Sequence, residues 1–185
     1  MTGTGILSEV IDPASIPAAG IERRITASDA ERAALAEACG LIEVRSLAAE
    51  TTLGRGQGST VAVDGRVRAE IVQTCVVSLE PVVQAIDEPF QVRFAPPDAR
   101  PRPATRKAAS EVVVDPTAPD PPEILDPAGI DLGAIVEEHF VLAIDPYPRA
   151  AYARLPGEPG DPVAPGEDSP FAVLASLKRD RGRAG

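Results

Sequence analysis

The stretch STVAVDGRVRAEI at residues 59–71 carries the strongest structural signal in the chain. Apolar and polar residues alternate on both sides of Asp64-Gly65, which is the pattern of strands that bury one face. Val63 and Val67 share that face if they pair across a three-residue loop, Asp64 to Arg66, which is favoured over a two-residue turn. The stretch therefore predicts an antiparallel hairpin within a larger sheet.

Segments on either side extend this sheet. Residues 41–53 are interpreted as a strand before the hairpin, and residues 83–94 as a strand after it, in which Phe90, Val92 and Phe94 alternate. Such a meander predicts an antiparallel sheet that is either open or barrel-like.

Two helices are expected to pack on the sheet. Ser28 and Glu31 have the spacing of a capping box, which predicts a helix that ends before Gly40. Asp131 can cap a second helix over about residues 131–144. Apolar residues recur along it at helical spacing: Leu132, Ile135, Val136, Phe140 and Ala143. A sheet with a few helices predicts the α+β class.

Proline divides the chain. Residues 96–122 and 146–168 are proline-rich, and proline lacks a backbone donor and disfavours helix before it. We therefore expect an α+β domain over residues 1–145 with a long Pro-rich loop. A Pro/Gly-rich linker at 146–168 and a C-terminal amphipathic helix with a basic tail at 169–185 would follow.

The terminal segment holds the candidates for contact with a partner or with RNA. An apolar stripe precedes four cations there: Phe171, Leu174, Leu177, Lys178, Arg179, Arg181 and Arg183. With Asp180 counted, the last eight residues have a net charge of +3. The remaining chain has a net charge of −13, and together these give −10. The helix could dock on its own domain or in a partner's groove, and the tail suits phosphates.

Composition and charge exclude several classes of protein. The chain has 28 Asp+Glu against 18 Lys+Arg, which argues against coating nucleic acid, DNA included, through bulk charge. No apolar run approaches the roughly 20 residues that cross a bilayer, and the first residues lack the features of a secretory signal. A cytoplasmic protein without membrane contact is expected.

Residue types that commonly carry catalysis are few and isolated. His139 is the only histidine, and it is adjacent to Glu138, so the two side chains point to different faces of a helix. Cys75 has no neighbouring cation in sequence and is interpreted as a buried strand residue. The segment GRGQG at 54–58 lacks the Lys and Ser/Thr of a phosphate loop and is interpreted as a hairpin connection. No catalytic, cofactor or metal site is predicted.

Three parts of the chain resemble the YceD family, bacterial and plastid proteins named for accumulation of large-subunit ribosomal RNA. SPFAVLASLK at 169–178 strongly resembles the family's C-terminal signature, residues 130–144 its central helix and residues 65–82 its hairpin and cysteine segment. Many members have the pattern Cys-x-Arg-Cys, whereas Val77 and Ser78 stand at its last two positions here. A single cysteine cannot form a structural zinc site.

The resemblance implies a role in ribosome biogenesis. It brings no catalytic residues, so the favoured hypothesis is a non-enzymatic factor for synthesis, processing or accumulation of 23S rRNA. Its partners would be pre-ribosomal RNA, a ribosome-assembly protein, or both. Two alternatives stay open. One is a metal-dependent nuclease, for which Glu70, Glu80 and Glu138 are the carboxylates near predicted regular structure. The other is a sensor or binding module based on Cys75.

Overall fold

The computed structural model describes residues 5–56, 59–97 and 121–154. By its internal contacts the chain divides into two units, Met1–Ala150 and Ala151–Gly185, and the helices and strands of the structure lie in the first. Its elements are β1 (Val10–Ile11), η1 (Pro13–Ser15), β2 (Ile21–Thr26), α1 (Asp29–Cys39), β3 (Glu43–Arg55), β4 (Val61–Thr74), β5 (Pro81–Ala95), β6 (Glu123–Ile124), β7 (Ile130–Asp131) and α2 (Leu132–Leu142).

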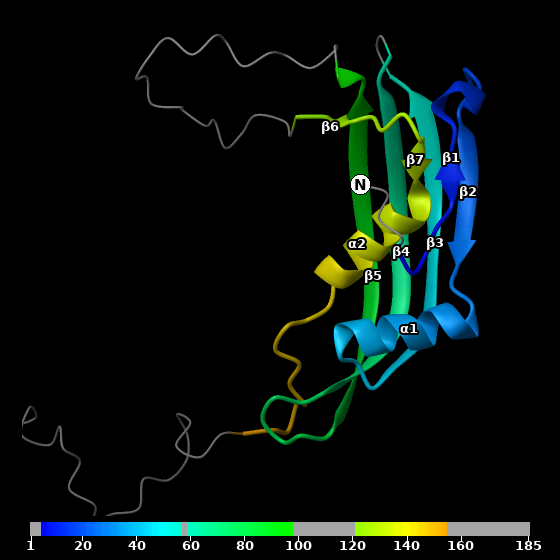
Figure 1. The fold of residues 1–185 in the computed structure, drawn as a ribbon. Coiled ribbons are helices and arrows are strands. Elements are labelled where there is room, and N and C mark those ends of the chain that lie inside the picture. The colour runs from blue at the N-terminus through cyan, green and yellow to red at the C-terminus, as the bar shows by residue number, and fades with distance from the viewer. Residues whose placement is uncertain (1–4, 57–58, 98–120, 155–185) are drawn as a thin grey trace, which may run out of the picture. The chain divides into compact units, whose positions relative to one another are not determined.

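Three long strands form the centre of the fold. β3, β4 and β5 make an antiparallel meander within a five-stranded sheet ordered β2-β3-β4-β5-β6 (Figure 1). β6 pairs with β5 in parallel, and only at Phe94 and Ala95. β1 and β7 form a separate two-stranded sheet. The α+β class is confirmed, and within the described residues the sheet is open rather than closed into a barrel.

The predicted turn at Asp64-Gly65 is wrong. β4 runs through both residues without interruption, and Gly65 pairs with Phe90 in the middle of the sheet. The alternation could not reveal this, because Val63 and Val67 share a face in an unbroken strand as well as across a three-residue loop. The glycine is needed for close approach, since a Cβ at Gly65 would lie 2.3 Å from Cζ of Phe90.

The hairpin between β3 and β4 lies at the glycine-rich segment instead. The strand register joins Arg55 to Val61, and the Gly56 N–H donates to the Thr60 carbonyl at 2.9 Å. β3 and β4 are therefore joined as a hairpin after Arg55, although Gly54 and Arg55 belong to β3 and residues 57–58 lie outside the described residues. The proline-rich loop expected at 96–122 lies mostly outside the described residues.

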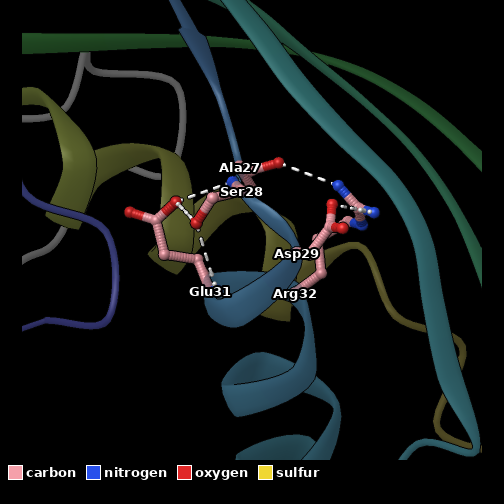
Figure 2. Close-up of polar contacts among 5 residues, drawn as sticks. All are labelled: Ala27, Ser28, Asp29, Glu31 and Arg32. Carbon is pink, nitrogen blue, oxygen red and sulfur yellow. Dashed lines mark hydrogen bonds and ion pairs between the residues drawn. The ribbon is translucent and has the colours of Figure 1, made fainter.

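The capping box predicted for α1 is present. The Ser28 Oγ accepts from the Glu31 N–H at 3.4 Å, and Glu31 Oε2 accepts from the Ser28 N–H at 2.7 Å (Figure 2). Arg32 forms an ion pair with Asp29 at 2.9 Å in the same turn. The helix ends at Gly40, whose φ of 65° is left-handed, as a C-terminal glycine allows.

Both helices cover the same face of the sheet (Figure 1). α2 begins at Asp131, whose Oδ1 accepts from the Ala134 N–H at 3.2 Å, as the sequence indicated. The core between helices and sheet is apolar and includes Leu35, Leu53, Val63, Val67, Ile71, Phe90, Val136 and Phe140. The alternate residues of the strands project from the opposite face, which is mostly exposed.

The N-terminal segment is attached to α2. The N–H groups of Ile6 and Leu7 donate to Glu137 Oε2 at 2.7 and 3.1 Å, and the Leu132 N–H donates to the Glu9 carbonyl at 2.8 Å. Leu7 is 2% exposed. The first described residues are therefore part of the core layer that α2 forms.

Candidate functional site

The predicted contact residues of the terminal segment lie outside the described residues. They remain predictions from sequence: Phe171, Leu174, Leu177, Lys178, Arg179, Arg181 and Arg183. The described part of the chain offers three other places to consider, namely the exposed sheet face, the Cys75 turn and the surroundings of His139.

The exposed sheet face carries arginines and carboxylates in alternation. Arg66 forms an ion pair with Asp87 at 2.7 Å, and Arg68 bridges Glu50 at 3.3 Å and Asp87 at 3.5 Å. Hydrogen bonding from Arg66 lowers the pKa of Asp87. These side chains are about half exposed, so solvent screens the pairs and their contribution to stability is small. The pairs fix a charge pattern across three strands.

A shallow cavity of about 690 Å³ opens where this face meets β2. It is lined by Glu22, Arg23, Arg24, Glu50, Thr51, Thr52, Asp64 and Gly65. Arg24 lies opposite Glu50 in the strand register, but Glu50 is paired with Arg68. Arg24 thus adds a cation with no carboxylate partner in the described part of the chain. The face suits a partner that carries both signs of charge.

The three carboxylates considered for a nuclease do not converge. Glu70 lies on the exposed sheet face and pairs with Arg45 at 2.9 Å. Glu138 lies on α2, which covers the other face, and Glu80 lies in the connection between β4 and β5. Residues 5–56, 59–97 and 121–154 contain no group of three possible metal-binding side chains.

Cys75 is buried, as expected, but it is not a passive packing residue. It follows the last residue of β4 and is 0% exposed, and its Sγ accepts the N–H of Ser78 at 3.3 Å and of Ala150 at 3.4 Å. The Ala150 N–H, followed by the groups of Ser78, lowers the pKa of Cys75 to about 6 against the opposing effect of burial. These backbone N–H groups favour the thiolate form, whereas burial opposes it.

Backbone hydrogen bonds join the Cys75 turn to a distant segment. The Val76 N–H donates to the Pro148 carbonyl at 2.9 Å, and the Cys75 N–H donates to the Glu80 carbonyl at 2.8 Å. Leu79 closes the turn at φ 62°, an uncommon conformation for leucine. The sequence does not predict these hydrogen bonds around Cys75, because every residue other than proline has a backbone N–H group and no residue type marks the donors.

His139 is half-buried on α2, as the sequence indicated. Its ring stacks on Phe90 with centroids 4.5 Å apart and an interplanar angle of 13°. The same phenyl ring also lies against Gly65. This contact fixes the orientation of the histidine.

These features together define a small α+β protein with a charged sheet face and a buried cysteine that accepts two backbone hydrogen bonds. The family of large ribosomal RNA subunit accumulation proteins, YceD, matches residues 63–178, which is more than half of the chain. The chain belongs to this family, and its role is ribosome-related. No curated protein and no solved structure gives a significant match. Among the described helices, neither has the length and apolar character needed to cross a membrane.

Proposed function

We propose that this protein is a non-enzymatic ribosome-biogenesis factor that supports synthesis, processing or accumulation of 23S rRNA. It acts in the cytoplasm by binding pre-ribosomal RNA, a ribosome-assembly protein, or both. The observation that carries the proposal is the family match, which extends from β4 to Lys178 and so includes β5, α2 and the whole terminal apolar stripe.

The positions of the acidic side chains support binding rather than catalysis. Metal-assisted cleavage of RNA needs carboxylates that meet on one rigid surface. Glu70 and Glu138 lie on opposite sides of the sheet, and the Glu70 carboxylate is paired with Arg45.

The folded domain and the terminal tail differ in charge, and they therefore suit different partners. The exposed sheet face holds Arg66 and Arg68 in ion pairs, so it is nearly neutral and suits a protein partner. The basic tail from Lys178 to Arg183 has four cations against one carboxylate in its sequence and suits phosphate groups. We propose that the folded domain contacts protein and the tail contacts RNA.

The test is complementation in cells that lack the gene. The full chain should restore the ratio of 23S to 16S rRNA, whereas a chain without residues 169–185 should not, although the remaining domain stays folded by circular dichroism. Replacing Lys178, Arg179, Arg181 and Arg183 by Gln separates the contribution of charge from that of the apolar stripe. Normal 23S rRNA with the truncated chain would overturn the proposal, and so would magnesium-dependent cleavage of precursor RNA by the purified protein.

A further inference from the structure

The Cys75 turn, residues 75–80 between β4 and β5, exposes apolar side chains at one end of the sheet. Val76 is 52% exposed and Leu79 is 75% exposed. Tyr147 is 76% exposed, and it lies on the segment after α2 that runs beside the turn (Figure 1). The two segments are joined where the Val76 N–H donates to the Pro148 carbonyl at 2.9 Å. Apolar side chains that gather on an exposed surface commonly mark a site of interaction.

Hydrogen bonds hold this turn in one conformation. The Cys75 N–H donates to the Glu80 carbonyl at 2.8 Å, and the Leu79 N–H donates to the Cys75 carbonyl at 3.0 Å. The Cys75 Sγ accepts the N–H groups of Ser78 and Ala150 at 3.3 and 3.4 Å. The exposed side chains are therefore presented from a fixed backbone, which reduces the conformational entropy that binding must offset.

Leu79 adopts a backbone conformation that favours glycine. Its φ of 62° is left-handed, and no other residue with a side chain has a positive φ in the described part of the chain. This conformation is strained for a residue that has a Cβ. Burial does not offset the strain, because the leucine is 75% exposed. A glycine would form the same turn with less strain, so the turn itself does not explain the leucine.

Shape and charge indicate the kind of partner. The apolar side chains stand on a turn and do not line the cavity of the exposed sheet face, so they suit a pocket on another molecule. The chain without its last eight residues has a net charge of −13, which opposes the phosphate groups of RNA and of anionic lipids. A protein with an apolar pocket and a basic rim complements both the side chains and the charge.

We propose that Val76, Leu79 and Tyr147 insert into such a pocket on a protein partner. Leu79 is the anchor, and removal of its side chain from water favours association. This inference deepens the proposed function, on which it rests for the identity of the partner as a ribosome-assembly protein. It assigns the protein contact of the folded domain to the Cys75 turn.

Leu79→Gly separates binding from folding. Glycine adopts a φ of 62° without strain, so the midpoint of urea unfolding should stay close to that of the wild type or rise. Binding should nevertheless fall about tenfold, because the apolar anchor is lost. Leu79→Asn is a second variant, since asparagine also tolerates this conformation. Leu142→Asn is its matched control, because Leu142 is 72% exposed on α2 and its loss should leave binding unchanged.

Binding is measured in cells with the full chain, in which photo-reactive benzoylphenylalanine stands in place of Tyr147. Irradiation should give a protein adduct whose yield falls about tenfold with either Leu79 variant and is unchanged with Leu142→Asn.

Four outcomes would overturn the inference. They are an adduct that survives both Leu79 variants, one that ribonuclease removes, one that contains lipid, and a crosslink within the chain itself. Failure of the proposed function is a separate result, because normal 23S rRNA in cells without the gene leaves the Leu79-dependent protein adduct unchanged.

Discussion

The phenyl ring of Phe90 fills the space directly above Gly65, its partner across β4 and β5. The sheet can carry the ring there only because Gly65 has no side chain. The imidazole of His139 stacks on the same ring, which links the centre of β4 to α2 through one aromatic residue.

Gly65→Ala should therefore destabilise the protein, by about 1–3 kcal/mol, as overpacking of a core does. The new Cβ would lie 2.3 Å from Cζ of Phe90. Gly54→Ala is the matched control in the neighbouring strand, since its Cβ would meet no atom within 4 Å. Urea unfolding of both variants gives the comparison, and similar midpoints would show that Phe90 moves aside without cost.

Ser28→Ala should cost about 1 kcal/mol of stability, because the capping box of α1 loses its hydroxyl. Hydrogen bonds from Ser28 also lower the pKa of Glu31, so the variant should raise that pKa toward its ordinary value. NMR titration of the Glu31 carboxyl checks the second effect. An unchanged titration would mean that the backbone N–H of residue 28 alone stabilises the carboxylate.

Cys75 should make the stability depend on pH. Its pKa is about 6 in the folded protein and about 9 when unperturbed, so the unfolded chain binds the proton that the folded chain releases. The unfolding free energy should rise between pH 6 and 9 relative to Cys75→Ser, and the difference between the two proteins should become constant below pH 6. Ultraviolet absorbance of the thiolate provides an independent titration.

Cys39→Ser is the control for this experiment. Burial raises the pKa of Cys39, so that residue cannot produce a rise in stability with pH. A flat difference between wild type and Cys75→Ser across this range would contradict the assigned ionisation. Normal 23S rRNA accumulation with Cys75→Ser would exclude a sensor role for this thiol while leaving its structural role intact.

Arg66→Gln should raise the pKa of Asp87 toward its ordinary value, because the main hydrogen bond to that carboxylate is lost. Arg45→Gln is the matched change on the same face and should leave Asp87 unaffected, since Arg45 pairs with Glu43 and Glu70. The free energy of unfolding should change little in both variants, because solvent screens exposed ion pairs. Carboxyl NMR titration distinguishes them, and equal titrations would disprove the pairing.

The sequence predicted what depends on nearby residues. Helix ends at Ser28 and Asp131 follow from capping side chains within four positions, and strand faces follow from alternation. The predicted turn at Asp64-Gly65 was wrong, because an unbroken strand places Val63 and Val67 on the same face just as a three-residue loop does. The reason for that glycine lies 25 residues away, in the ring of Phe90.

The candidate sites were harder to predict for the same reason. The ionisation of Cys75 depends on a backbone N–H of Ala150, 75 residues along the chain, and no side chain signals it. The family signature at 169–178 was recognisable from residues alone, because it is a local pattern.

The attachment of the N-terminal segment to α2 has a consequence for synthesis of the chain. Glu137 accepts hydrogen bonds from Ile6, which is made 131 residues earlier. At about 5–20 residues per second, the ribosome takes on the order of ten seconds to make the intervening residues. Leu7 cannot pack against α2 during that time. The part of the core that the N-terminal segment and α2 form is therefore completed late in translation.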